Sequence, residues 1–467
     1  MAQNFVACDR DQELLLPPSL RDWLPEGHLA WFVIDAVAQV DLTAFYAAYR
    51  VDGHGRPAHD PAMMVALLLY GYAIGERSSR RLERRCIEDV ATRVICANRA
   101  PDHTTIARFR QRHEAALGEL FGEVLALCAQ AGLVRVGVVA VDGTKVAANA
   151  APQATRDYEQ IAREILAEAD AVDAEEDARF GEALGDELPP ELSTAQGRRG
   201  WLREAKRRLD EKRAEEARPI PRDRPGRLRE AKRRLEEEHR TECRANAAYE
   251  AYRARGRMKD GRRFGRPPDP FRPPPAPTGK INLSDLDSRN VKTSRGWVQG
   301  YNAQAACTED QIVIAAELTV DSPDFGHLQP MIRAAQRELR AAGVDQPPGV
   351  VLADAGYWHQ AQMERLVSDG MKVLIPPDAK KRSGARPGWE GGPYAFMRRV
   401  LETDTGGQLY AKRQTMIEPI FADTKFNRRI DRFLRRGRSA ARSEWRLANA
   451  AHNLLKLWRH TNAPAAA

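Results

Sequence analysis

The chain has 467 residues and a formal net charge of +8, from 73 Lys and Arg against 65 Asp and Glu. Its length predicts about two to four domains, and its 43% of apolar residues are enough for a sizeable core. The basic excess, with a pI near 9.2, favours nucleic acid or another anionic partner. Six cysteines without any Cys-x-x-Cys pair exclude a disulfide framework and a cysteine zinc site, and this usage is typical of the cytoplasm.

Residues 1–132 are predicted to form an all-α N-terminal domain. The chain begins without the basic start and long apolar run of a secretory signal. Its most apolar stretch, 63–74, is too short to span a bilayer and is expected to be a core helix that begins after Asp60 and Pro61. Further helices are expected over 78–91 and over 104–132.

Arginines accompany the last of these helices. Ile106 and Phe109 keep the helical spacing of an apolar stripe, while Arg108, Arg110 and Arg112 lie off it. A helix, a break and a basic second helix can enter a DNA groove. The alternative is a solvated basic face on a supporting domain. Arg108 and Arg112, one turn apart, are the candidate DNA contacts.

Residues 150–280 form a charged insertion in a chain that otherwise changes to strands after residue 132. The segment "LREAKRRLDEKR" at 202–213 recurs as "LREAKRRLEEEH" at 228–239, 26 residues later. Both copies are rich in helix formers, which is compatible with a helical hairpin. The apolar content is too thin for an independent core, so we expect a projecting arm or a partly disordered segment. The proline-rich stretch 265–279 is expected to be a stiff linker.

The parts on either side of the insertion, 133–149 and 281–462, are predicted to form one α/β domain, followed by a disordered tail, 463–467. With the insertion excised, the elements follow the order β, β, β, α, β, α, β, α, which predicts a mixed sheet flanked by helices. The expected strands are 134–142, 296–307, 311–320, 349–358 and 371–377, and the expected helices are 325–343, one ending near 369, and 412–461.

Three carboxylates stand where this order of elements can bring them together. The first strand ends at Asp142 and the fourth at Asp354, and an α/β sheet places its chemistry at strand ends. Glu418 follows on the last helical region. Three such carboxylates can hold two Mg²⁺ ions about 3.5–4 Å apart, which clamp the attacking and leaving oxygens of an in-line phosphodiester displacement. Mn²⁺ is the expected substitute.

Basic residues accompany these acids and would neutralise phosphates. Lys425 lies two helical turns after Glu418, and Tyr410 and Arg413 stand just before it. Lys145 follows the first acid.

Other residues compete for these roles. Asp321 and Asp324 also follow a strand and are rivals of Asp354, and Asp423 is a rival of Glu418. Asn449 and Asn453, four residues apart on the last helix, either line the site or serve as caps or surface residues.

A set of motifs carries a family resemblance. In the core these are "VAVDGTKVAANA", "VQGYNAQAA", "LADAGYW" and the series Tyr410, Arg413, Glu418, Lys425. Before the core stand "GRPAHDPAMMVALLLYGY" and "PDHTTIARFRQRH". Together they resemble the DDE transposases of bacterial insertion sequences, over roughly 20–150 and 280–460. Arg413 lies one residue further from Glu418 than in the family pattern.

The resemblance implies a ribonuclease-H-like catalytic core and a metal-dependent DNA transposase. It implies Asp142, Asp354 and Glu418 as catalytic metal ligands, and Tyr410, Arg413, Lys145 and Lys425 as DNA contacts. The expected partners are the terminal inverted repeats, the target DNA and a second copy of the chain, in the cytoplasm at the nucleoid, with neither a membrane nor a small-molecule cofactor. Two alternatives stay open: a ribonuclease-H-like nuclease without strand transfer, and a non-catalytic DNA-binding protein derived from a transposase.

Overall fold

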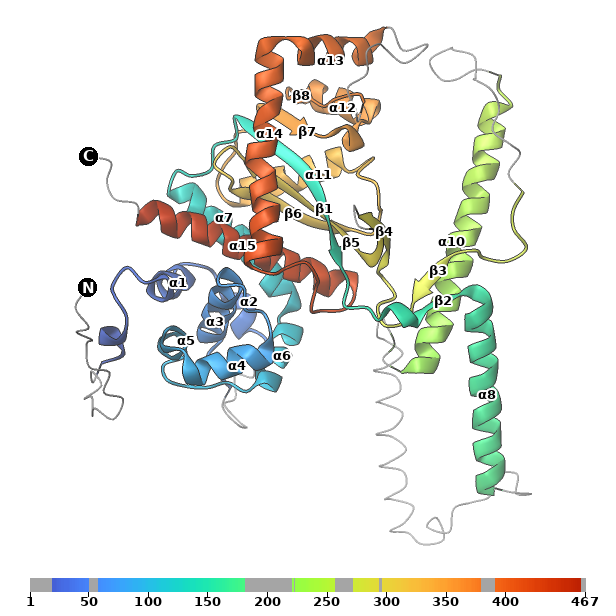
Figure 1. The fold of residues 1–467 in the computed structure, drawn as a ribbon, viewed down its shortest axis with the longest axis horizontal. Helices are drawn as coiled ribbons and strands as arrows, with labels where there is room; N and C mark the ends of the chain where they lie inside the picture. The colour runs from blue at the N-terminus through green and yellow to red at the C-terminus, as the bar shows by residue number, and fades with distance from the viewer. Residues whose placement is uncertain are drawn as a thin grey trace, which may run out of the picture. The chain divides into compact units, whose positions relative to one another are not determined.

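The computed structural model describes residues 19–49, 58–180, 221, 223–256, 272–293, 296–378 and 391–462 (Figure 1). The chain divides into two compact units. Unit 1 comprises residues 1–146 and 301–467, and unit 2 comprises residues 147–300. The first copy of the repeat, residues 265–271 of the proline-rich stretch and the tail 463–467 lie outside the described residues.

Unit 1 begins with short helices, as the N-terminal sequence predicts. Asp60 caps α3 by accepting from the Ala62 N–H, with Pro61 in the first turn. Most of α3 is buried, in agreement with its apolar sequence. No helix in the described part of the chain is both long and apolar enough to cross a membrane. The helices of this region are α1 (Leu29–Val37), α2 (Thr43–Tyr46), α3 (Pro61–Ala73), α4 (Ser79–Glu88), α5 (Val90–Ile95), α6 (His103–Arg112) and α7 (Glu114–Gln130), preceded by a 3₁₀ turn (Leu20–Trp23).

The expected single helix over 104–132 is wrong, because it breaks at His113. The His113 backbone leaves the helical region (φ −105°, ψ 29°) and separates α6 from α7. Its ring packs 4.4 Å from the Phe109 ring and 5.2 Å from the Phe45 ring, measured between centroids. Arg110 also differs from the expectation: it is buried, with its guanidinium 5.8 Å from the centre of the Tyr72 ring.

The mixed sheet predicted for the core is confirmed. Its strands follow the order β4-β5-β1-β7-β8, and β6 also pairs with β5. The pairs β1–β7 and β7–β8 are parallel, while β4–β5 and β5–β6 are antiparallel. The strands are β1 (Val138–Ala147), β4 (Arg289–Thr293), β5 (Gly296–Thr308), β6 (Val313–Thr319), β7 (Val350–Ala353) and β8 (Lys372–Leu374).

Helices flank this sheet. α11 and α15 both pack against β6, and α15 also packs against α7 and α3 (Figure 1). The last helical region is not continuous, contrary to the expectation, because the chain leaves the helix between residues 428 and 437. The helices are α11 (Leu328–Ala341), α12 (Gln360–Ser368), α13 (Gly392–Glu402), α14 (Asp404–Ala422) and α15 (Arg438–Thr461), with a π-helical turn (Asp423–Asn427) directly after α14.

Unit 2 contains a small hydrophobic core, which the insertion 150–280 forms together with residues just after it. The core brings together side chains from α8 (Tyr158–Phe180), α10 (Arg224–Arg253), β3 (Lys280–Asn282) and the turn after β3, and β3 pairs with β2 (Thr155–Asp157). Its fully buried members are Ile161, Leu228, Ala231, Leu235, Ile281 and Leu286. The second copy of the repeat forms part of α10.

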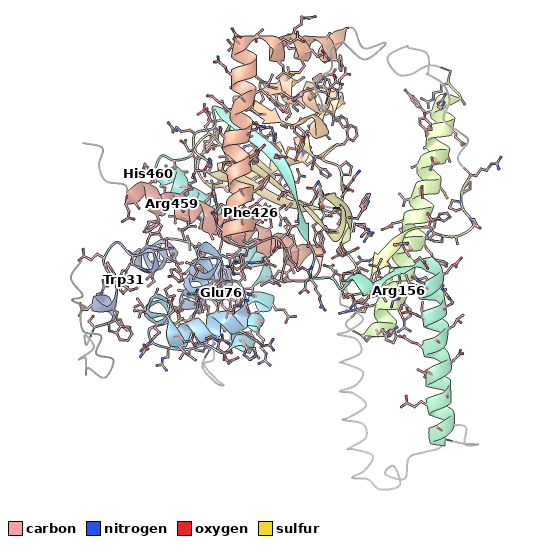
Figure 2. The ribbon with its side chains drawn as sticks, in the orientation of Figure 1. Trp31, Glu76, Arg156, Phe426, Arg459 and His460 are labelled. Atoms are coloured by element: carbon pink, nitrogen blue, oxygen red, sulfur yellow. The ribbon has the colours of Figure 1, made fainter. Side chains whose placement is uncertain are left out.

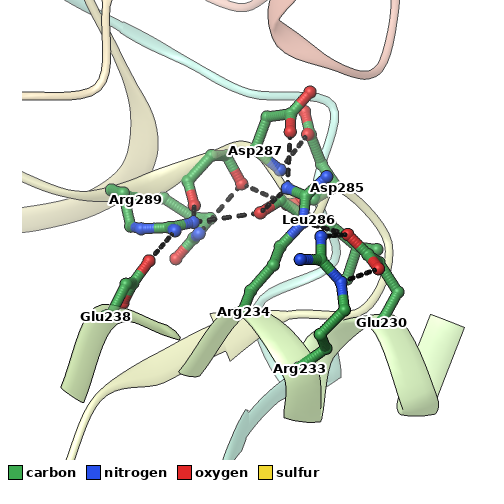
Figure 3. A network of polar contacts seen from close by, with 10 residues as sticks. Glu230, Arg233, Arg234, Glu238, Asp285, Leu286, Asp287 and Arg289 are labelled. Carbon is green, nitrogen blue, oxygen red and sulfur yellow. Dashed lines mark hydrogen bonds and ion pairs between the residues drawn. The ribbon is translucent and has the colours of Figure 1, made fainter. Parts of the chain in front are cut away.

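Charged contacts hold a turn of unit 2 against α10 (Figure 3). Arg234 donates to Asp287 at 2.6 Å, to Glu230 at 2.7 Å and to the Leu286 carbonyl at 3.2 Å. Arg289 of β4 forms an ion pair with Glu238 of α10. The high charge of the insertion therefore serves its internal structure at these positions.

A buried ion pair joins the N-terminal helices of unit 1 to α15. Arg77, just before α4, lies 2.7 Å from Glu444, and the Glu444 side chain is fully buried. Arg77 also donates to the carbonyls of Arg429 and Arg432. Glu444 accepts from the Leu434 N–H. Every charge of the pair is therefore hydrogen-bonded, which is the condition for burying it without a large loss of stability.

We expect Arg77→Ala to lower the free energy of unfolding of unit 1 by about 3–5 kcal/mol, because it leaves the Glu444 carboxylate buried without a cation. Denaturant unfolding of the two proteins measures the difference. Arg81→Ala is the matched control, since the Arg81 side chain is 66% exposed and lies 3.8 Å from Glu76. Its effect should stay within about 0.5 kcal/mol. Equal effects of the two substitutions would contradict the role given to the buried pair.

Candidate active site

The register of β1 and β7 places two of the predicted acids side by side. The last paired residues of these parallel strands are Val141 and Ala353. Asp142 directly follows Val141 on β1, and Asp354 directly follows the end of β7. The expected strand end at Asp142 is nevertheless wrong, since β1 continues to Ala147. What ends at this point is its pairing with β7.

Burial and charge act together on the Asp142 carboxyl. Its side chain is 17% exposed, and burial raises its pKa to about 6, opposed by the Arg413 guanidinium and assisted by Asp354. Arg413 donates to Oδ2 at 2.7 Å, and the Gly143 N–H donates to Oδ1 at 2.7 Å. Asp142 is therefore an inward-facing carboxyl with one strong cationic partner.

Asp354 caps the short 3₁₀ turn that follows β7. Its Oδ1 accepts from the Gly356 N–H at 2.9 Å. Burial raises the pKa of this carboxyl, the Asp324 charge raises it further, and Arg413 and Lys145 oppose the shift. Both acids thus bind protons more tightly than free aspartates, chiefly because burial disfavours the charged carboxylate.

α14 contributes the third predicted acid through Arg413. The Arg413 side chain is 11% exposed and bridges Asp142 and Glu418, with its Nη2 3.6 Å from Glu418 Oε1. Glu418 itself is 54% exposed. Burial raises the pKa of Tyr410, and its interaction with Arg413 opposes the shift. One guanidinium therefore links the tyrosine and two of the acids.

A fourth carboxylate, Asp324, belongs to the same cluster. Its Oδ1 accepts from Asn302 Nδ2 and Gln304 Nε2, each at 2.7 Å, and lies 3.4 Å from Lys145 Nζ. Sequence reasoning named Asp324 only as a rival and missed both amides. The signal was present: Asn302 and Gln304 stand two apart within the otherwise apolar run 300–307, so they share one face of β5.

Gly143 makes room for this polar cluster. A Cβ at residue 143 would lie 2.3 Å from Gln304 Nε2, 2.5 Å from Asp324 Oδ1 and 2.8 Å from Asn302 Oδ1. Any side chain would therefore push the cluster apart. The glycine after Asp142 is therefore required by close packing against β1 and does not mark a turn.

The two predicted lysines meet at β1, where Lys145 lies. Lys425, on the π-helical turn, donates from Nζ to the Lys145 carbonyl at 2.9 Å. Burial lowers the pKa of the Lys425 ammonium, and the charge of Asp431 opposes the shift. The structure thus gathers Asp142, Asp354, Glu418, Tyr410, Arg413, Lys145 and Lys425 around one site, through the contacts given above.

The remaining candidates lie elsewhere. Arg108 and Arg112 are exposed on α6, where they line a cavity of about 610 Å³ together with Thr104, Thr105 and Tyr49, among others. The Arg112 guanidinium lies 5.3 Å from the centre of the Tyr49 ring. These arginines form a separate polar surface of unit 1.

The rival residues have structural partners. Asp321 pairs with His327 at 3.1 Å, and Asp423 pairs with Arg428 at 2.9 Å. Asn453 is fully buried and bonds both the N–H and the carbonyl of Val313. Asn449 is also buried and donates to the Trp445 carbonyl. Both asparagines are buried, so the expectation that they could be surface residues is wrong.

The donor set suits a hard divalent cation, because it consists of carboxylate and amide oxygens. Asn302 Oδ1 is buried and accepts no hydrogen bond from the described residues. Among those residues, no group of three His, Cys, Asp or Glu side chains is arranged to hold a metal ion. The Arg413 guanidinium instead supplies the positive charge between Asp142 and Glu418.

The raised pKa of Asp142 makes metal-free stability depend on pH. An unfolded aspartate titrates near 4 and folded Asp142 titrates at about 6. Between these values the folded chain keeps a proton that the unfolded chain has released, so stability falls as pH rises. We expect Asp142→Asn to be more stable than the wild type at neutral pH, by up to about 3 kcal/mol, and to lose this advantage below about pH 4.

Thermal unfolding in chelator, between about pH 4 and 8, measures this difference. Asp321→Asn, at an exposed carboxylate, is the matched control and should not reproduce the pH-dependent gain. An Asp142→Asn advantage that grew toward low pH would contradict the predicted sign.

Two family models match the chain. Residues 18–112 match the Transposase domain (DUF772), and residues 278–454 match the Transposase DDE domain. Neither the curated proteins nor the solved structures include a detectable match. The second model covers Asp354, Glu418 and the first part of α15, and the first ends at Arg112. The chain therefore belongs to the DDE transposases of insertion sequences, a family of phosphoryl-transfer enzymes that act on DNA and generally use a divalent metal.

Proposed function

We propose that this transposase cuts DNA at the ends of its insertion sequence and joins those ends to target DNA, with Asp142, Asp354 and Glu418 as its metal-binding acids. The observation that carries the proposal is the register of β1 and β7, which sets Asp142 beside Asp354. Arg413 connects this pair to Glu418.

The proposed reaction has two chemically similar steps. Water attacks a phosphodiester at the element's end, the bond to the 3′ oxygen breaks, and a 3′-hydroxyl is left. That hydroxyl then attacks a phosphodiester of the target, forming one phosphodiester bond as another breaks. Two Mg²⁺ ions, or Mn²⁺ in their place, would activate the attacking oxygen and stabilise the charge on the leaving one.

In this proposal, basic side chains and one tyrosine contact the DNA beside the acids. Arg413 and Tyr410 border the acids on α14, and Lys145 and Lys425 border them on β1 and the π-helical turn. Their donors suit the oxygens of the reacting phosphate. The joining of two DNA ends further suggests a homodimer bound to the terminal repeats.

The acids are tested by substitutions that keep shape and remove charge. Asp142→Asn, Asp354→Asn and Glu418→Gln should each lower Mg²⁺-dependent nicking and strand transfer to background, because a neutral amide is a poor ligand for Mg²⁺. DNA binding should stay near that of the wild type. The assay uses the DNA that flanks the gene at its native locus, with nicked and joined products separated by electrophoresis.

Asp321→Asn is the matched control and should keep nicking. Nicking by Asp354→Asn with loss of nicking in Asp324→Asn would move the second acid to Asp324. Full activity in all three variants would refute the proposed site. Nicking by the wild type without any joined product would favour a nuclease, and DNA binding without nicking would favour a non-catalytic protein.

The helical region is proposed to bind DNA through α6. Replacing Arg108 and Arg112 by Ala should weaken binding to the element ends and lower the slope of log affinity against log salt by up to about 1.8, as expected for two lost phosphate contacts. The control replaces Arg333 and Arg337, which are exposed one turn apart on α11. An unchanged slope, or the same change in both double variants, would leave α6 as a supporting element.

A further inference from the structure

The segment between α14 and α15, residues 426–436, is held in place by its backbone. Arg77 donates to the carbonyls of Arg429 at 2.7 Å and Arg432 at 2.9 Å. Glu444 accepts from the N–H groups of Leu434 and Arg435. Because main-chain groups make these contacts, they fix the segment without using the guanidinium groups of Arg429 and Arg432.

Two pairs of side chains in this segment differ sharply in exposure. Ile430 and Phe433 are fully buried and anchor it from within. Arg429 and Arg432 are exposed, and no hydrogen bond or ion pair of their guanidinium groups occurs among the described residues. The Arg429 backbone has a positive φ of 55°, a strained conformation that the bond from Arg77 to its carbonyl helps to maintain.

Phe426 stands at the start of this segment, on the π-helical turn, and is 75% exposed (Figure 2). Buried Arg428 braces the turn by donating to Asp423 at 2.9 Å, to Thr424 at 2.7 Å and to the Ala448 carbonyl at 2.7 Å. A single exposed phenylalanine is ordinary. Here, however, Phe426 stands on a braced π-turn, three and six residues before the exposed Arg429 and Arg432, and such turns are frequent at functional sites.

The π-helical turn that carries Phe426 is bonded to β1, the strand that carries Asp142. Lys425, the neighbour of Phe426, is bonded to the carbonyl of Lys145, three residues after Asp142 on β1. Asp431 is the only acidic residue of the segment, and its charge acts on Lys425. The exposed charge of Arg429 and Arg432 is therefore available to an anionic partner close to the site.

We propose that Phe426, Arg429 and Arg432 form a DNA-contacting surface that guides the duplex into the active site. The two guanidinium groups bind backbone phosphates, which they match in shape and charge. The Phe426 ring packs against a base or between two bases, as exposed aromatic and apolar side chains do in many DNA complexes. The inference rests on the proposed function for the position of the reacting phosphate and takes DNA as the family's partner.

Binding without divalent metal tests the arginines independently of catalysis. The probes are a duplex with the gene's flanking sequence and a scrambled duplex of equal length. Replacing Arg429 and Arg432 by Ala should weaken binding to both duplexes and lower the salt slope by up to about 1.8. The Arg333 and Arg337 double variant, with the same change of charge, should keep the wild-type slope. An unchanged slope, or an equal fall in the control, would overturn the proposal.

Phe426→Ala should lower affinity roughly five- to a hundredfold while leaving the salt slope unchanged, because the ring carries no charge. Phe396→Ala is the matched control, since Phe396 is 57% exposed on α13. Equal affinities of the wild type and Phe426→Ala would overturn the role of the ring. Unchanged thermal unfolding of all variants would show that the fold is intact, as expected for exposed positions.

The two proposals fail in different ways. If the acid substitutions abolish nicking while the Arg429 and Arg432 double variant binds as the wild type, only the DNA surface is refuted. If the acid substitutions leave nicking intact while that double variant loses binding, the surface stands and the proposed catalytic site is refuted.

Discussion

The parallel pairing of β1 with β7 is the constraint on which the site depends. Parallel strands with a fixed register bring the same positions of two distant segments together, and here the last pair is Val141 with Ala353. Asp142 and Asp354 come from segments more than two hundred residues apart in the sequence, with the whole of unit 2 between them. A register slip of one residue would turn one carboxylate to the other face of the sheet. The buried apolar run before each acid therefore determines the geometry of the chemistry.

Burying several carboxylates creates an electrostatic problem, and α14 reduces it. Burial raises the pKa of both Asp142 and Asp354, and Arg413 opposes both shifts. One guanidinium does not neutralise the cluster, because Asp324 adds a further charge that Lys145 offsets only at 3.4 Å. The site consequently favours additional positive charge. Burying these carboxylates in their charged form costs the metal-free protein stability at neutral pH, and a divalent cation would offset that cost.

Much of the fold was predictable because its signals are local. Apolar runs and the cap at Asp60 indicate elements regardless of what packs on them, and the two strand-borne acids follow from such runs. The break at His113 was not predictable, since neither Gly nor Pro marks it and its cause is packing against Phe45 and Phe109. The place of Asp324 depends on amides of β5, and the core of unit 2 depends on apolar residues from separate segments. Such features exist only after the chain has folded.

The buried ion pair of Arg77 and Glu444 joins the two regions that match the family models. Arg77 lies in the region that matches the DUF772 domain, and Glu444 lies in the region that matches the DDE domain. Breaking this ion pair would leave two buried charges without their partners, which costs several kcal/mol. The same arginine holds the carbonyls that precede α15, so the helical region also supports the segment after α14. The exposed arginines of α6 and the acids both belong to unit 1. Under the proposed function, the distance between a bound end sequence and its cleavage point would therefore be set within unit 1.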